Sequence, residues 1–272
     1  MINFQSRFAW YELITTDLQS AKTFYSRVMG WQVLDASLPG RPYSLFAAGS
    51  TLVGGVMDLT KEAREMGAAS GWVGYVEVND VNATVNCIKQ LGGVVHVLPT
   101  EVPNISRYCI FADPQTARLA ALKWLKPSQR QWPMDAPGCV CWHELLAANS
   151  DDALNFYAGL FGWQKEDAES GQFGTYQMFS AGGQTIGGII TKPPMISAPF
   201  WLYYFHIGDL DMAIRRVKAA GGQILNGPIE LPVGAWIVQC ADPQGAVFAL
   251  EGKLGKKVIG YFNDARGRRW SW

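Results

Sequence analysis

The feature that most constrains this chain is that its sequence is repeated. The stretch AWYELITTDLQSAKTFY, from Ala9 to Tyr25, is matched 132 residues later by CWHELLAANSDDALNFY, from Cys141 to Tyr157. Further matches follow in the same order at offsets between 129 and 133, ending with ADPQ at residues 112–115 and 241–244. Ordered matches over this length indicate an internal duplication. We therefore expect two halves with the same fold.

Each half contains one succession of patterns twice. An alternating apolar run at 9–15 precedes Asp17, a favourable helix N-cap, and the apolar residues that follow recur at helical spacing until Gly30. Three runs rich in β-forming residues come next, at 31–34, 43–47 and 51–57. The pattern restarts at Trp72 with a strand, a helix within 80–93, and strands near 94–98, 107–111 and 118–124. The sequence thus predicts an α+β fold of tandem βαβββ modules, two per domain.

The domain boundaries follow from the duplication and from a Pro-rich, polar stretch, KPSQRQWPMDAPG, at 126–138. We expect a first domain at 1–126, a linker at 127–138, a second domain at 139–254 and a C-terminal tail at 255–272. From residue 253 onward the chain carries six Lys and Arg residues against one Asp, interleaved with Tyr261, Phe262, Trp270 and Trp272. We expect these aromatic side chains to pack on the other half or on a neighbouring subunit, which leaves a homodimer open.

The charge balance excludes several classes of partner. Lys plus Arg equals Asp plus Glu at 23 each, so the chain has no net field to attract nucleic acid or an acidic membrane surface. No apolar segment approaches the roughly 20 residues that span a bilayer, and we expect a cytoplasmic protein that binds neither nucleic acid nor membrane. Five cysteines make an odd number for a disulfide framework, and Cys139 and Cys141 lack a second pair with which to bind zinc.

Four stretches resemble the vicinal-oxygen-chelate superfamily, which includes glyoxalase I, bleomycin and fosfomycin resistance proteins, and extradiol dioxygenases. They are DLQSAKTFYSRVMGW (17–31), NSDDALNFYAGLFGW (149–163), GDLDMAIRRVKAAGG (208–222) and DPQGAVFALE (242–251). The resemblance spans about residues 6 to 254. It implies that each domain is a curled mixed sheet around a cavity, with the helices outside. The superfamily contains metal lyases, metal oxygenases and metal-free binding proteins, so it leaves the activity open.

A metal site is one hypothesis for the second half. His143, His206 and Glu251 are its candidates for a site of two histidines and one carboxylate, which suits non-haem Fe(II). They fall on the first strand of one module, the first strand of the next and the last strand. By resemblance, these are the elements that supply the metal ligands in extradiol dioxygenases.

The strand register argues against that hypothesis. By resemblance, the family's ligand positions fall on Trp142, Leu202, Ala249 and the pair at 187–188, none of which is a metal ligand. Because strand residues alternate between faces, Trp142 and Glu144 are expected to face the cavity and His143 the layer under the helix. A β-bulge before His143 would reverse that assignment. We predict no metal at the usual positions and no cofactor, with one Fe, Mn, Zn or Ni ion on His143, His206 and Glu251 as the alternative.

The expected ligand-binding residues share the cavity-facing parity of their strands. They are Trp10, Glu12 and Tyr75 in the first half and Trp142, Glu144, Tyr204 and His206 in the second. Aromatic walls with a few polar groups suit a flat or hydrophobic small molecule. A carboxylate held against aromatic surface has a raised pKa, so Glu144 paired with His206 is a hypothetical general acid/base pair. Side chains that simply fill the interior are the alternative.

Three functions therefore remain open. The prediction is a protein similar to glyoxalases and bleomycin resistance proteins that binds a small aromatic or hydrophobic molecule in a barrel cavity, without the usual metal. The alternative is a metal-dependent enzyme of the superfamily, an extradiol dioxygenase or a glyoxalase-type lyase. The third is a non-catalytic scaffold with filled cavities.

Overall fold

The computed structural model describes residues 6–37, 42–65, 67–126, 136–171, 174–232, 234–255, 262–263 and 269–270. The first half contains β1 (Phe8–Thr15), α1 (Leu18–Met29), β2 (Gln32–Asp35), β3 (Tyr43–Ala48), β4 (Thr51–Asp58), α2 (Lys61–Glu65), β5 (Gly71–Glu77), α3 (Val81–Gln90), β6 (Val94–Val102), β7 (Ser106–Ala112) and β8 (Arg118–Trp124). The second half contains β9 (Val140–Ala147), α4 (Ser150–Phe161), β10 (Gln164–Gly171), β11 (Gly174–Ala181), β12 (Gln184–Thr191), β13 (Phe200–Asp209), α5 (Leu210–Ala219), β14 (Gln223–Glu230), β15 (Trp236–Ala241) and β16 (Val247–Lys253).

Each half forms one eight-stranded mixed sheet, as the tandem βαβββ modules predict. The strand order is β2-β3-β4-β1-β5-β8-β7-β6 in the first half and β10-β11-β12-β9-β13-β16-β15-β14 in the second. The two modules of a half meet at the antiparallel pair β1/β5 or β9/β13. In the described part of the chain each order ends at two edge strands, so the sheets are curled but do not close into the expected barrel. Helix α2, between β4 and β5, was not predicted.

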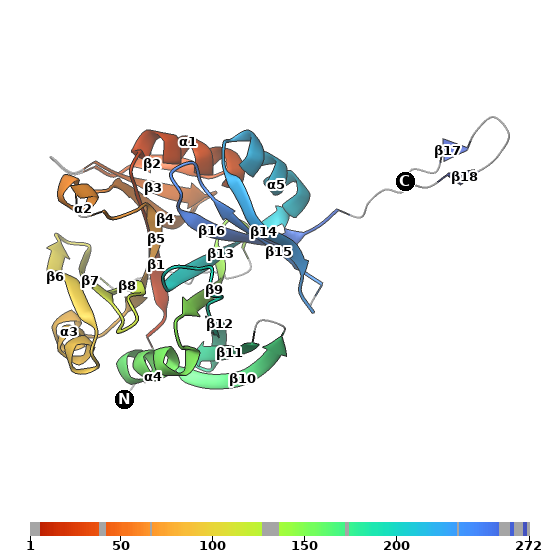
Figure 1. Cartoon of the computed structure of the whole chain (residues 1–272). Helices are drawn as coiled ribbons and strands as arrows, with labels where there is room; N and C mark the ends of the chain where they lie inside the picture. Colours follow the sequence, from red (N-terminus) through yellow and green to blue (C-terminus); the bar gives the residue numbers. More distant parts are fainter. Residues whose placement is uncertain are drawn as a thin grey trace.

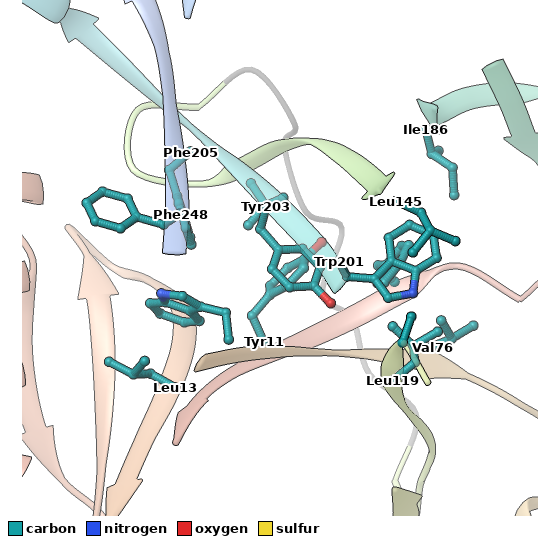
Figure 2. Close-up of a cluster of buried hydrophobic side chains, with 14 of the residues drawn as sticks. Tyr11, Leu13, Val76, Leu119, Leu145, Ile186, Trp201, Tyr203, Phe205 and Phe248 are labelled. Carbon is teal, nitrogen blue, oxygen red and sulfur yellow. The ribbon is translucent and has the colours of Figure 1, made fainter. Parts of the chain in front are cut away.

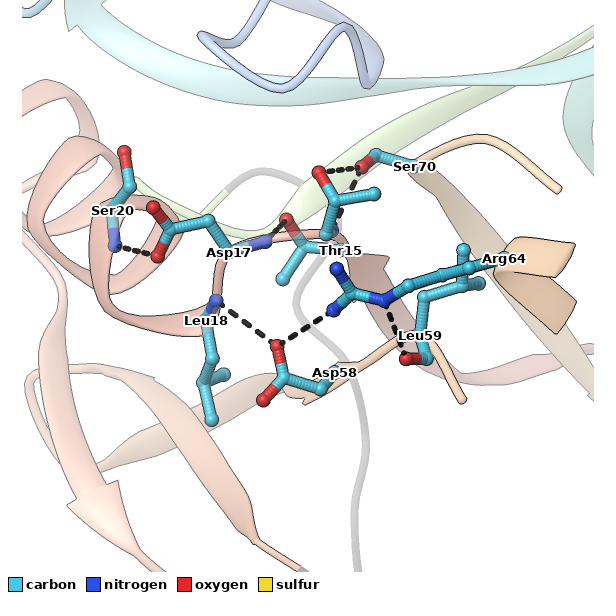
Figure 3. Close-up of polar contacts among 9 residues, drawn as sticks. Thr15, Asp17, Leu18, Ser20, Asp58, Leu59, Arg64 and Ser70 are labelled. Carbon is cyan, nitrogen blue, oxygen red and sulfur yellow. Dashed lines mark hydrogen bonds and ion pairs between the residues drawn. The ribbon is translucent and has the colours of Figure 1, made fainter. Parts of the chain in front are cut away.

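Local signals in the sequence set the ends of helix α1. The Asp17 carboxylate accepts a hydrogen bond from the Ser20 amide at 3.0 Å, and Gly30 ends the helix in the left-handed conformation, with φ of 73°. The Asp58 carboxylate accepts a hydrogen bond from the Leu18 amide, also at the start of this helix, and lies 3.6 Å from the Arg64 guanidinium (Figure 3). These contacts hold the start of α1 against the end of β4 and against α2.

Helices α1, α3, α4 and α5 lie on the face of each sheet opposite its concave face, and there the two halves meet (Figure 1). Helix α1 of the first half contacts α5 of the second, and α3 contacts α4. Buried side chains from both halves join in a single hydrophobic core, part of which is drawn in Figure 2. Burial of this shared apolar surface is the main term that stabilises the arrangement. The two halves therefore share a core.

Contacts between the halves come in pairs related by the duplication. The Tyr25 hydroxyl donates to Asp242 at 3.2 Å, and its counterpart Tyr157 donates to Asp113 at 3.0 Å. At the centre, residues meet their own duplicates: the Tyr11 hydroxyl lies 2.6 Å from His143 Nε2 across 132 residues. A residue contacts its own equivalent only near a two-fold axis. The halves are therefore arranged like the subunits of a symmetric dimer.

None of the helices in the described ranges is long and apolar enough to cross a membrane. In the C-terminal tail, β17 (Phe262–Asn263) pairs with β18 (Arg269–Trp270). The expected packing of the tail's aromatic side chains, and the linker expected at 127–138, fall largely outside the described residues.

Candidate functional site

The first strand of each half separates a concave face from the shared core. On β1, Trp10 packs in a cluster on the concave face, whereas Tyr11 and Leu13 belong to the shared core. On β9, Trp142 packs on the concave face and His143 is buried on the other side. Glu144 follows Trp142 at the same parity and bonds to concave-face residues.

A β-bulge does lie on each of these strands, but before the residues in question. The pairing of β1 with β5 shifts between Phe8 and Trp10, and that of β9 with β13 shifts at the duplicate position, between Trp142 and Val140. The bulge therefore precedes Trp142 and leaves the alternation from Trp142 onward unchanged. A bulge between Trp142 and His143 would have been needed to turn the imidazole to the concave face.

His143 is a core residue at the junction of the halves, a position that does not favour the three-residue metal alternative. Its ring is 3% exposed and stacks on Phe8 with centroids 3.9 Å apart. Nδ1 lies 2.6 Å from the Ile186 carbonyl oxygen, which can only accept, so Nδ1 carries the proton and Nε2 accepts from the Tyr11 hydroxyl. The neutral imidazole thus satisfies both partners. The sequence did not indicate the tyrosine partner from the other half.

The protonation of His143 predicts a pH dependence of stability. Burial lowers its pKa from 6.5 to about 4. Since the pKa in the folded protein lies below the unfolded value, the contribution is fully present above pH 6.5 and is lost as the pH falls toward 4. The slope in this window approaches about 1.4 kcal/mol per pH unit. Denaturant unfolding at pH 7, 6 and 5 measures it, with His143→Phe as the reference that lacks the titrating group. Equal slopes in both proteins would contradict the assignment.

The concave face of the first half encloses a cavity of about 220 Å³. Its walls come from strands across the whole sheet, which shows that the sheet curls around it. Aromatic and aliphatic side chains dominate, and Glu12 is the only charged one. The lining residues are Trp10, Glu12, Ala36, Tyr43, Leu45, Leu52, Met57, Tyr75, Val102, Ile105, Ser106, Tyr108, Leu122 and Trp124.

A carboxylate and a phenol form the polar centre of this cavity. The Tyr75 hydroxyl donates to Glu12 Oε2 at 2.6 Å, and both side chains are at least nine-tenths buried. Burial, followed by the neighbouring Glu12, holds the pKa of Tyr75 well above its usual value, so the phenol keeps its proton. The structure therefore brings together the three residues expected for the first half: Trp10, Glu12 and Tyr75.

A second tyrosine in each half was missed by sequence reasoning. The Trp10 indole donates to the Tyr43 hydroxyl at 3.3 Å, and in the second half Trp142 donates to Tyr176 at 2.7 Å. Both tyrosines lie over a strand glycine: a Cβ atom on Gly55 or Gly188 would collide with the ring or hydroxyl. The available signal was the repeat itself, because Tyr43 and Tyr176, and Gly55 and Gly188, each recur at an offset of 133.

On the second concave face Glu144 bonds to Tyr204 rather than to His206. The Tyr204 hydroxyl donates to Glu144 Oε2 at 2.7 Å and accepts from the Gln239 amide at 3.3 Å. Protein atoms surround the Glu144 carboxylate although part of its side chain stays solvent-accessible, and this burial raises its pKa. His206 Nδ1 instead lies 3.7 Å from Glu251 Oε1. The expected pair of Glu144 and His206 is not formed, because Glu144 on β9 lies opposite Leu202 of β13, four residues before His206.

The residues at the family's metal positions do not fit a divalent ion. In the second half Leu202 lies opposite Glu144, and Ala249 lies opposite Tyr204. The Tyr176 ring fills the space over Gly188. These positions carry neither a carboxylate nor an imidazole, whereas catalytic metal sites use three or more donors. Within the described ranges, no three His, Cys, Asp or Glu side chains are grouped so that they could hold a metal.

Comparison with known proteins places the chain in a family. The model of the Glyoxalase/Bleomycin resistance protein/Dioxygenase superfamily matches residues 7–120 and 142–250. A candidate glyoxylase of Mycobacterium bovis, CFP32, is 30% identical over 244 residues, covering 89% of this chain and 92% of its own. The anthracycline biosynthesis protein DnrV of Streptomyces peucetius is 28% identical over 259 residues, covering 89% of this chain and 91% of its own.

Solved structures of low sequence identity share the fold. The Mn(II)-bound glyoxalase of Novosphingobium aromaticivorans superposes with a TM-score of 0.61 at 17% identity, covering 92% of this chain and 84% of its own. The 2,3-dioxygenase LapB of Pseudomonas sp. KL28 superposes with a TM-score of 0.62 at 12% identity, covering 98% and 96%. Both duplicated units match the family model. The chain belongs to the glyoxalase/bleomycin resistance protein/dioxygenase superfamily, also called the vicinal-oxygen-chelate superfamily.

Proposed function

We propose that the cavity of the first half binds a small, largely apolar aromatic molecule through one polar group, without a metal. The observation that carries the proposal is the Glu12–Tyr75 pair, a carboxylate and a phenol buried in a cavity with otherwise apolar and aromatic walls. A hydroxyl or N–H group of the ligand would donate to Glu12, while the rings of Trp10, Tyr108 and Trp124 would flank its aromatic body.

The free energy of desolvation supports a functional role for Glu12. Moving a carboxylate from water into an apolar cavity costs several kcal/mol unless partners replace the lost hydration. An apolar residue would fill this space without the cost of desolvation. Residues that cost stability and line a cavity are typical of binding sites.

The names of the relatives agree with an aromatic ligand. DnrV and DauV are both described as anthracycline biosynthesis proteins, and CFP32 as a candidate glyoxylase. The first description supports a polycyclic aromatic ligand class and the second an enzyme of the glyoxalase type. The metal-dependent enzyme stays the alternative function, although the residues at the metal positions do not favour it.

Binding of 1-naphthol to the whole chain tests the proposal. We expect Glu12→Gln to weaken binding about 10-fold to 100-fold, because a hydrogen bond to a charged group contributes about 1.5–3 kcal/mol. Isothermal titration calorimetry gives the dissociation constant. Glu144→Gln, at the duplicate position in the other half, is the matched control and should leave binding to the first half unchanged.

Thermal unfolding separates binding from a structural role. Removal of a buried charge that serves a ligand should leave the melting temperature unchanged or raised, whereas loss of a structural carboxylate should lower it. Tyr75→Phe provides a second variant of the same pair. If Glu12→Gln binds 1-naphthol like the wild type, or if no binding occurs at all, the proposal fails.

A further inference from the structure

We propose that the ligand of the first half is longer than its cavity, with an apolar part that leaves the mouth and lies on a rim formed by Leu34 and Ile105. This inference rests on the proposed function. It narrows the ligand to elongated amphiphilic aromatic molecules that carry a hydrogen-bonding group at the inner end.

The cavity is smaller than the pockets that usually hold small-molecule ligands. A dry cavity of about 150 Å³ holds one benzene molecule, and pockets for ordinary small-molecule ligands measure about 300–1,000 Å³. The cavity of about 220 Å³ therefore encloses little more than one substituted ring. A ligand of ordinary size must extend beyond the mouth.

Exposed apolar side chains lie beside the mouth of the cavity. Ile105, in the turn between β6 and β7, lines the cavity and is nevertheless 52% exposed, so it lies at the mouth. Leu34 on β2 is 43% exposed and pairs with Leu45, which lines the cavity. Residues opposite each other on antiparallel strands share a face, so Leu34 continues the apolar wall outward. The two residues come from opposite edges of the curled sheet and are both apolar.

The duplicate shows that the fold does not require an apolar rim. Gly234 stands at the position of Ile105 in the second half, and the exposed Glu166 and Asp167, at the β10 bulge, stand at that of Leu34. Inside, Glu251 replaces Leu122. At these two positions the apolar side chains are therefore a property of the first half.

The single charged residue of the lining restricts which chemical group the ligand can carry at its inner end. Glu12 is the only charged group among the residues that line the cavity, and no Lys, Arg or His is among them. A phosphate or carboxylate would meet a like charge there without a compensating cation. A phenol or a similar neutral donor fits the Glu12–Tyr75 pair, with its apolar substituent directed outward.

The test compares a short probe with a long one on the full chain by calorimetry. Phenol fits inside the cavity, whereas the chain of 4-hexylphenol must reach the rim. Since burial of one methylene tightens binding by about fourfold, loss of two or three rim contacts is measurable. We expect Ile105→Asn and Leu34→Asn each to weaken binding of 4-hexylphenol about 5-fold to 20-fold and to change binding of phenol less than twofold.

Leu98→Asn is the matched control, because Leu98 is 66% exposed on β6 and does not line the cavity. If Leu98→Asn weakens 4-hexylphenol as much as Ile105→Asn does, the gain with length is non-specific and the inference is overturned. If phenol binds through Glu12 but neither rim variant changes the affinity for 4-hexylphenol, only the inference about the rim fails. If neither phenol nor 4-hexylphenol binds the wild type, the proposed function fails with it.

Discussion

Replacing His143 with alanine is expected to lower the free energy of unfolding by about 4 kcal/mol. The substitution removes a ring that is 3% exposed and stacked on Phe8, and a core cavity of that size alone costs about 3 kcal/mol or more. It also leaves the Tyr11 hydroxyl and the Ile186 carbonyl without this partner in the core. Urea unfolding followed by circular dichroism at pH 7.5 measures the loss.

His206→Ala is the natural control for this experiment. The His206 side chain is 29% exposed and its Nδ1 lies 3.7 Å from Glu251 Oε1, so its loss should cost less than about 1 kcal/mol. A metal-ligand role for both histidines would instead predict that the two variants behave alike and that added Fe, Mn, Zn or Ni stabilises only the wild type. Equal small losses in both variants would show that the Tyr11–His143 contact does not hold the halves together.

Gly74→Val is expected to cost about 3 kcal/mol or more, because its side chain has no space at the junction. A Cβ atom there would lie 2.6 Å from the Tyr203 hydroxyl and 2.7 Å from the Phe8 ring. The Gly74 amide also donates to the Tyr203 hydroxyl at 2.7 Å, a bond that any displacement of Tyr203 breaks. Overpacking of a buried site costs about 1–3 kcal/mol, to which the lost hydrogen bond adds.

Gly71→Val tests whether the effect is local. Gly71 lies on the same strand, and a Cβ atom there meets nothing within 4 Å. We expect its replacement to change the melting temperature little. In a double-mutant cycle, Tyr203→Ala should cost less in the Gly74→Val background than in the wild type, since the smaller residue makes room for valine. Additive effects would place the strain of Gly74→Val somewhere other than at Tyr203.

The two halves differ in a way that a symmetric dimer could not. At the axis, Tyr203 faces its own duplicate Gly74, and the hydroxyl of the tyrosine occupies the space that the glycine leaves open. Two tyrosines would collide at this position, and two glycines would leave a void. Fusion of the halves in one chain lets each position of a pair change independently. The same freedom accounts for an apolar cavity in the first half and polar substitutions, such as Glu251 for Leu122, in the second.

The order of helices and strands followed from local patterns in the sequence. Asp17 and Gly30 mark the ends of α1 because their capping chemistry acts within a few residues. The faces of Trp142 and Glu144 followed from strand alternation and from comparison with the duplicate. Helix α2 was not predicted, because its five residues, Lys61–Glu65, are too few to show a periodic apolar pattern.

Long-range contacts were decided only by the tertiary structure. The partner of His143 is a tyrosine from the other half, and no local pattern encodes which surfaces of two similar units meet. Glu144 bonds to Tyr204 of β13 and not, as expected, to His206. The two candidates lie only two residues apart on the strand, a distance of about 6.6 Å. The role of Tyr43 and Tyr176 depended on a glycine from a neighbouring strand.

The sequence by itself thus determined the duplication, the modules and the faces of their first strands, because these depend on interactions between near neighbours and on a periodicity of two. The tertiary structure decided that the halves share one core about a two-fold axis. It also decided that His143 serves this junction and that the first concave face closes around Glu12 and Tyr75. Those outcomes depend on shape complementarity between residues more than a hundred positions apart, or on adjacent strands, and packing of that kind has no signature in a single local stretch.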